Sequence, residues 1–247
     1  MWSGPSRNDE FSGATGSVRI DCSCRQTTGT ENHAAATESP ELLHLAGRGG
    51  AGENQTFDRP FGDRVEPWEL MSWAGATASW PNRTDPGGTR GLDDYFTRDF
   101  AHNIGAEIMG RNKFGYQRGP WTDHEWQGWW GDEPPFHTPV FVLTHHVRPS
   151  FTLSDTTFHF LDATPAEAAE QAKAAADGRD VRVGGGVSTV REFLDAGLID
   201  TLHIAVAPVT IGTGLKLWET PEELDDRYHH ESVPSSSGVT HHLFWRK

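Results

Sequence analysis

The sequence has few of the residues that mark secreted, membrane or metal-binding proteins. It contains two cysteines, Cys22 and Cys24, so no disulfide framework indicates a secreted scaffold. No apolar run approaches the ~20 residues that a membrane span needs, and the N-terminus lacks the apolar core of a signal peptide. The thirteen histidines include adjacent pairs but no H-E-x-x-H spacing. We therefore expect a cytoplasmic protein without a metal site, in which the histidines are structural or lie on the surface.

Basic residues are also scarce. The 247 residues include 21 Lys and Arg against 35 Asp and Glu, which gives a formal net charge of -14. A nucleic-acid partner requires a basic face, and anionic membranes attract basic segments. We therefore expect neither a nucleic-acid partner nor a membrane partner, and a small-molecule substrate instead.

The first 43 residues differ in composition from the rest of the chain. They are rich in Ser, Thr, Gly, Asn and Glu and lack apolar periodicity, which is typical of poorly ordered segments. We interpret residues 1–43 as a poorly ordered or atypical N-terminal extension and residues 44–247 as one domain. A natural extension and a chain that starts in a shifted reading frame both agree with this pattern.

The second half of the chain alternates strands and helices. Strands are predicted near Phe158–Leu161, at Val181–Val183 and at Thr201–Val209. Helices are predicted to begin at the capping boxes Thr164–Glu167 and Thr189–Glu192. This order indicates an α/β fold.

Two amphipathic helices and a long aromatic loop are predicted upstream. The helices span Val65–Trp80 and Leu92–Asn103, and Tyr95, Phe96 and Phe100 are expected to face the core. The loop, residues 115–135, contains four tryptophans: Trp121, Trp126, Trp129 and Trp130. These rings either cover the edge of the core or form a wall that stacks on a planar heterocycle.

Three consecutive glycines, Gly184–Gly186, separate a predicted strand from a predicted helix. Because glycine has no Cβ atom, a phosphate can approach this backbone closely. The first N–H groups of the following helix lack intrahelical partners and point toward such an anion. A tight turn without a ligand is the alternative, since the run is not the G-x-G-x-x-G fingerprint.

Two other predicted strands end in residues suited to an anionic ligand. One ends at Gly110 and is followed by Arg111 and Asn112, and the other ends with Thr144 and His145. Arginine offers a planar fork for phosphate oxygens, and the threonine and histidine offer further donors. Ligands of open α/β sheets bind at such strand ends, so the set predicts a site for a phosphate-bearing cofactor.

Four segments together resemble the dihydrofolate reductase-like superfamily. They are Ile108–Phe114, Pro139–His145, Val183–Thr189 and Leu198–Gly214, in the family's order and near its spacing. The chain is most similar to the C-terminal reductase domain of the bifunctional deaminase–reductase of riboflavin biosynthesis, over roughly residues 50–247. The resemblance implies a central mixed, mostly parallel sheet flanked by helices, and a homodimer formed through the C-terminal part of the sheet.

The resemblance also implies NADPH as the hydride donor. On this basis Gly110, Arg111 and Asn112 line the cofactor phosphates, and Thr144 and His145 lie at the adenosine 2′-phosphate. The residues that would cradle the pyrophosphate are Gly184, Gly185, Gly186, Val187, Ser188 and Thr189.

The implied function is reduction of a small heterocyclic substrate at a CH–NH or related group. The substrate would be a phosphorylated ribosylaminopyrimidine, as in riboflavin biosynthesis, or dihydrofolate. The catalytic residues are unknown, although Glu53 and Asp58 lie in the region expected to supply a proton. Ala46 replaces an acidic residue that the family has after its first strand. This departure motivates two alternatives: a nucleotide-cofactor-binding protein without turnover, and an inactive chain that keeps only the core of the fold.

Overall fold

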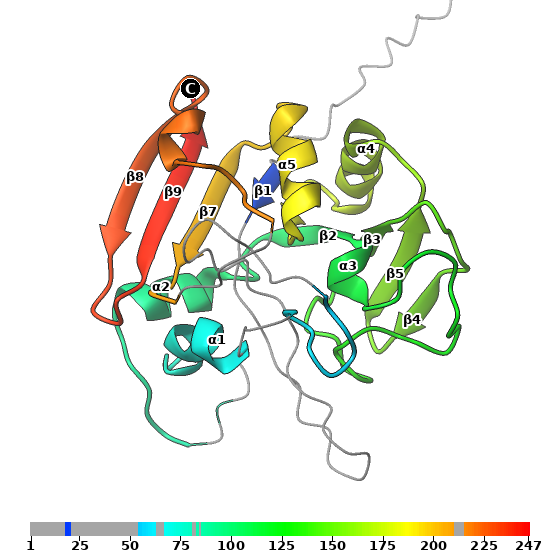
Figure 1. The fold of residues 1–247 in the computed structure, drawn as a ribbon, viewed down its shortest axis with the longest axis horizontal. Coiled ribbons are helices and arrows are strands. Elements are labelled where there is room, and N and C mark those ends of the chain that lie inside the picture. The colour runs from blue at the N-terminus through cyan, green and yellow to red at the C-terminus, as the bar shows by residue number, and fades with distance from the viewer. Residues whose placement is uncertain (1–17, 21–53, 63–66, 81–82, 84, 210–214) are drawn as a thin grey trace, which may run out of the picture.

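The fold is built on one mixed β-sheet (Figure 1). The computed structural model describes residues 18–20, 54–62, 67–80, 83, 85–209 and 215–247. Within them the strand order is β4-β5-β3-β2-β6-β1-β7-β9-β8. The strands are β1 Val18–Ile20, β2 Ile104–Gly110, β3 Val140–Leu143, β4 Phe151–Leu153, β5 Thr156–Leu161, β6 Asp180–Val183, β7 Thr201–Val206, β8 Tyr228–Pro234 and β9 Thr240–Arg246.

The strands from β5 to β7 in this order pair in parallel, and antiparallel strands flank them. The interior strands β2 and β6 are buried along their whole length, as expected for parallel strands covered on both faces. The helices are α1 Pro67–Gly75, α2 Leu92–Asp99, α3 Arg111–Phe114, α4 Pro165–Ala175 and α5 Val187–Asp195, with a 3-10 helix at Pro221–Leu224. The predicted α/β fold with a mixed, mostly parallel sheet is confirmed.

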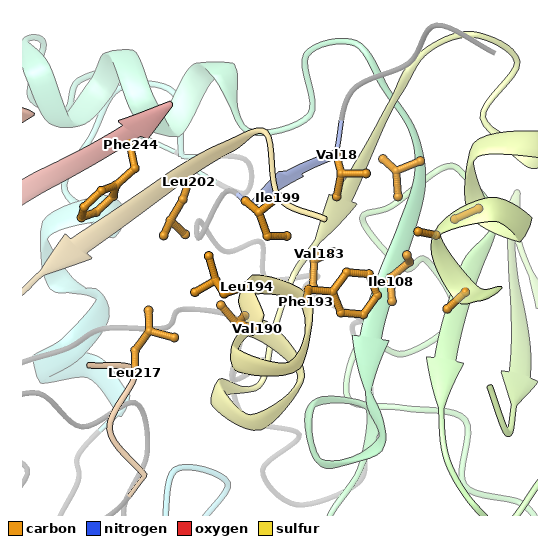
Figure 2. Close-up of a cluster of buried hydrophobic side chains, with 14 of the residues drawn as sticks. Val18, Ile108, Val183, Val190, Phe193, Leu194, Ile199, Leu202, Leu217 and Phe244 are labelled. Carbon is orange, nitrogen blue, oxygen red and sulfur yellow. The ribbon is translucent and has the colours of Figure 1, made fainter. Parts of the chain in front are cut away.

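Helices α4 and α5 cover one face of the sheet, and α1 and α2 lie on the other side (Figure 1). The first face holds the larger apolar cluster, in which Val190 and Phe193 of α5 pack with Ile108 and Val183 of the sheet (Figure 2). Alternate residues of a strand point to opposite faces. Met109, the neighbour of Ile108, therefore belongs to a different cluster on the opposite face.

The aromatic loop covers the part of that second face formed by β2, β3 and β5. No helix or strand is described between residues 115 and 139. Trp130 lies over Phe158 with ring centroids 5.7 Å apart, and Phe114 and Trp121 belong to the same buried cluster. Large apolar rings therefore cover this part of the core in place of a helix. The prediction that the tryptophans cover the edge of the core is confirmed.

The two predicted capping boxes have different outcomes. Helix α4 begins as predicted: the Thr164 side chain accepts a hydrogen bond from the Glu167 backbone, and the Glu167 carboxylate accepts from the Thr164 N–H. The N-cap of helix α5 is Gly186, three residues before the predicted cap Thr189, and it has no side-chain cap hydrogen bond. The predicted box at Thr189 is wrong because Thr189 is inside the helix, where its side chain is buried.

Other predictions near the edges of the fold are only partly correct. Phe96 and Phe100 are buried as expected, but Tyr95 is 51% exposed, so its predicted inward orientation is wrong. Strands β4 and β8 were not predicted. Both are edge strands whose residues are largely exposed or half-buried, so their sequences lack a strong apolar pattern.

Strand β1 lies in a stretch for which the sequence predicted no element. Val18 pairs with Val181 of β6, and Arg19 pairs with both β6 and β7. The Val18 N–H donates to Asp200 Oδ2 at 2.8 Å, and Arg19 Nε lies 2.9 Å from Asp180 Oδ2. Residues 18–20 therefore form a paired strand, which a poorly ordered extension would not contain. The boundary at residue 43 stays a prediction, and Ala46 lies outside the described residues.

No helix in the described part of the chain is long and apolar enough to cross a membrane.

Candidate functional site

A cavity of about 460 Å³ lies at the carboxyl ends of β2, β3 and β6. This volume is within the usual range for small-molecule sites. All eleven residues predicted to bind the cofactor line it: Gly110, Arg111, Asn112, Thr144, His145, Gly184, Gly185, Gly186, Val187, Ser188 and Thr189. The structure thus brings three distant segments together as the parallel strand order requires, while cofactor binding itself stays a prediction.

The first turn of α5 presents free backbone donors to this cavity. The first intrahelical bond runs from the Val190 N–H to the Gly186 carbonyl. Within the described chain, no backbone acceptor takes the N–H groups of Val187, Ser188 or Thr189. A Cβ atom at Gly186 would meet nothing within 4 Å, so the space beside this backbone is open. The arrangement fits an anionic group at the helix N-terminus.

Gly184 also has a packing role, beside its predicted place in the cavity lining. A Cβ atom there would lie 2.0 Å from Glu107 Oε1 and 2.3 Å from Lys113 Nζ. The glycine leaves room for a buried ion pair, so its contribution to close phosphate approach is indirect. Similarly, a Cβ atom at Gly110 would lie 2.3 Å from Thr189 Oγ1. This glycine lets the end of β2 pack against α5.

A buried group of charges adjoins the cavity. Glu107 lies 2.5 Å from Arg182 Nε and 3.3 Å from Lys113 Nζ, and all three side chains are at most 6% exposed. The Arg182 guanidinium also lies 3.6 Å from the ring centroid of Phe100. One carboxylate between two cations leaves an excess positive charge. Because Lys113 lines the cavity, this excess favours an anionic ligand.

The Arg111 guanidinium has donors left for such a ligand. It lies 3.7 Å from the ring centroid of Trp121, and its Nη1 donates to the Gly119 carbonyl. Its Nε and Nη2 atoms are buried without a hydrogen-bond partner. Burial, and then the charge of Arg118, lowers the pKa of Arg111 below its ordinary value. Unpaired buried donors are costly, and phosphate oxygens would satisfy them.

Thr144 and His145 lie at the rim. The Thr144 hydroxyl accepts from the His146 N–H at 3.1 Å, which orders the turn after β3. The His145 side chain is 93% exposed, and its Nδ1 lies 2.9 Å from Asp162 Oδ1. Thr144 is buried whereas His145 is exposed, and both line the cavity.

Several lining residues were not predicted from the sequence. They include Gln55, Phe61, Lys113, Gln117, Arg118, Glu192 and Leu215. Most follow no strand end, so no periodic pattern indicates them. By contrast Asp58 is exposed and does not line the cavity, and Glu53 lies outside the described residues. Asp58 is therefore not placed to supply a proton to this cavity.

The tryptophans of residues 115–135 do not line the cavity. The alternative in which they form its wall is therefore wrong for this site. Trp121 affects the cavity indirectly, because its ring packs against the guanidinium of Arg111, a residue that lines the cavity. Its Nε1 donates to the His146 carbonyl at 2.5 Å.

The histidines show structural contacts. His241 Nε2 lies 2.8 Å from Asp93 Oδ1, and His241 Nδ1 lies 2.9 Å from His203 Nε2, all in the core. Among the described residues, no group of three or more His, Cys, Asp or Glu side chains could hold a metal ion. Cys22 and Cys24 lie outside that part of the chain.

Residues 74–227 match the family model described as the RibD C-terminal domain. The match covers more than half of the chain, so the protein belongs to this family, the reductase domain of riboflavin biosynthesis. This confirms the family to which the sequence motifs pointed. A search of curated proteins finds no significant match.

Solved structures similar to this chain include three from bacteria. A protein assigned to riboflavin biosynthesis from Shewanella sp. PV-4 is 20% identical, with 72% of this chain and 88% of that chain covered and a TM-score of 0.44. Dihydrofolate reductase from Enterococcus faecalis, complexed with NADP(H) and RAB-propyl, is 16% identical, with 65% and 86% covered and a TM-score of 0.39. A pyrimidine reductase-like protein from Corynebacterium diphtheriae is 15% identical, with 70% and 88% covered and a TM-score of 0.40.

Proposed function

We propose that the protein is an NADPH-dependent reductase of a small heterocyclic substrate, of the type found in riboflavin biosynthesis. The observation that carries this proposal is the convergence of all eleven predicted cofactor residues on one cavity. Membership of the RibD C-terminal domain family supports a reductase. We also propose that the cofactor is NADPH and that the reduced group is a CH–NH or related group.

The residues of the cavity fit a dinucleotide with several phosphates. The N–H groups at the start of α5 would hold the pyrophosphate, beside the open space at Gly186. Arg111 would contribute the unpaired Nε and Nη2 donors. Thr144 and His145, at the rim, are proposed to contact the 2′-phosphate, which distinguishes NADPH from NADH.

When bound, reduced nicotinamide supplies a hydride to an imine or carbonyl-like carbon, and the adjacent nitrogen or oxygen takes a proton. The protein's part is to hold the two rings in contact and exclude water. Phe61 offers an apolar surface at the cavity and is only 3% exposed. Gln55 lies on the same segment and offers an amide for polar contact.

Binding without turnover is the weaker alternative. The motivation for it is Ala46, whereas the family match favours a reductase. Dihydrofolate remains the second candidate substrate. The cytoplasmic location and the homodimer remain predictions.

Single-turnover oxidation of NADPH tests the proposal. Purified protein loaded with NADPH is mixed with the phosphorylated ribosylaminopyrimidine or with dihydrofolate, and the absorbance of the reduced nicotinamide is followed. We expect oxidation with the pyrimidine at a rate that saturates with substrate. Tight NADPH binding without oxidation by either compound would support the alternative without turnover.

A further inference from the structure

Arg118 lies at the mouth of the cavity and joins two segments that are far apart in the sequence. It follows α3 on the aromatic loop, and it lines the cavity together with Gln55. Its Nη2 donates to Gln55 Oε1 at 2.9 Å. Its Nη1 donates to the carbonyls of Tyr116 at 2.9 Å and Gly115 at 3.3 Å. These contacts fix the plane of the guanidinium.

The same contacts leave one side of the guanidinium free. An arginine has five N–H donors: two on each terminal nitrogen and one on Nε. The two carbonyls use the Nη1 donors, and Gln55 uses one donor of Nη2. The Nε–H and one Nη2–H remain, and such charged donors bond well to phosphate oxygens.

Arg111 is held in the same way. Its Nη1 donates to the Gly119 carbonyl, while Nε and Nη2 have no partner. Both arginines are therefore tied through Nη1 to carbonyls of the loop 115–119 and keep donors on the Nε side. The charge of Arg118, after burial, contributes to the lowered pKa of Arg111, so the two cations repel each other.

Neither arginine forms a salt bridge within the described chain. In a protein of net charge -14, two arginines that line one cavity without an acidic partner form a local positive field that attracts an anionic ligand. We propose that Arg118, oriented by Gln55, is a second arginine ligand beside Arg111 for a phosphate group of the bound dinucleotide. This inference rests on the proposed function. The phosphate is the 2′-phosphate or the pyrophosphate, which share this chemistry.

Binding of NADPH and NADH to matched variants tests the assignment. The variants are Arg118→Gln, which removes the charge; Arg118→Lys, which keeps the charge but loses the fork; and Gln55→Ala, which removes the orienting contact together with the hydrogen bond from Gln55 Nε2 to the Pro60 carbonyl. Arg90→Gln is the control, because it removes one positive charge from an exposed residue that does not line the cavity. Affinities are measured by tryptophan fluorescence at several salt concentrations, and thermal melting of each free variant checks the fold.

We expect Arg118→Gln to weaken NADPH binding roughly tenfold or more and to reduce its salt dependence. Arg118→Lys should restore the salt dependence but only part of the affinity, and Gln55→Ala should cause a smaller loss. Loss confined to NADPH would assign the contact to the 2′-phosphate, and an equal loss for NADH would assign it to the pyrophosphate.

Unchanged affinity and salt dependence for both nucleotides in Arg118→Gln would overturn the assignment while leaving the proposed function intact. A wild-type protein that binds neither nucleotide would instead refute the proposed function itself. A similar loss in Arg90→Gln would show a general effect of net charge and would also overturn the role of Arg118.

Discussion

Gly184 lies so close to Glu107 that a Cβ atom on the glycine would be 2.0 Å from the carboxylate oxygen Oε1. Two residues later, a Cβ atom on Gly186 would meet no atom within 4 Å. The triple glycine therefore combines two functions: Gly184 accommodates a buried ion pair of the core, and Gly186 leaves space in the cavity.

Gly184→Ala is predicted to destabilise the fold. The added methyl group must displace Glu107 or Lys113, which are both buried, and so disturb their ion pair and that of Glu107 with Arg182. Overpacking alone costs about 1–3 kcal/mol, and weakening a buried ion pair adds to this. Urea unfolding followed by circular dichroism should show the loss. An unchanged unfolding midpoint would contradict the packing described here.

Gly186→Ala is predicted to weaken NADPH binding while leaving the fold intact. Gly186 has φ of -70°, which alanine adopts without strain, and its new methyl group would extend into open space beside the α5 N–H groups. We expect a loss of about tenfold in affinity, or ~1.4 kcal/mol, with an unchanged melting temperature. Gly185 is a poorer probe because its φ of 117° would strain any side chain. Unaltered affinity in Gly186→Ala would remove this turn from the cofactor site.

Stability is predicted to fall as the pH decreases below neutrality, in part because of His242. Burial, followed by the charge of His230, lowers the pKa of His242 below the usual 6.5, although Glu222 acts in the opposite direction. The unfolded chain thus binds the proton at a higher pH than the folded protein. Stability is complete above the unfolded pKa and is lost as the pH falls through 6.5 toward the folded pKa, by at most about 1.4 kcal/mol per pH unit for one proton.

The measurement is the free energy of unfolding of wild type and His242→Gln at several pH values between 8 and 5. Most other titrating groups are common to both proteins, so the difference between the two slopes reports His242 together with its contact with His230. We expect the variant to have the shallower pH dependence. Parallel curves would show that His242 does not titrate differently in the folded and unfolded states.

The homodimer is predicted to use the C-terminal edge of the sheet. Strand β8 is the last strand in the sheet order, so one side of its backbone has no neighbouring strand among the described residues. Trp245 of the adjacent β9 is 41% exposed. Light scattering should give a mass twice that of the 27.3 kDa chain, and Trp245→Lys should lower it. A mass of one chain at all concentrations would contradict the dimer.

The sequence predicted those parts of the fold and cavity that have strong local patterns. The apolar runs before Gly110, Thr144 and Gly184 identified three neighbouring parallel strands, and strand order then placed their ends together. Periodicity could not identify Val18–Ile20, because three residues between polar segments are too few for a pattern. Its strand partners are β6 and β7, and the Asp200 N–H, just before β7, donates to the Val18 carbonyl.

The remaining site residues depend on tertiary contacts. Arg118 and Gln55 are 63 residues apart, and neither belongs to a helix or strand. The close contact between Gly184 and Glu107 likewise joins the turn after β6 to β2. The sequence indicated only a ligand site at Gly184, whereas the packing of Glu107 also requires a glycine there. Local patterns identify strand ends, whereas side chains that come from loops are placed only by the folded chain.

The central claim is that the cavity at the ends of β2, β3 and β6 binds NADPH. Its most direct test is a titration of the purified full chain with NADPH and, in parallel, NADH, followed by tryptophan fluorescence. Trp121 is a suitable reporter because its ring lies against the guanidinium of Arg111, a residue that lines the cavity. We predict saturable binding in the micromolar range with a clear preference for NADPH. The absence of saturable binding of either nucleotide would contradict the account.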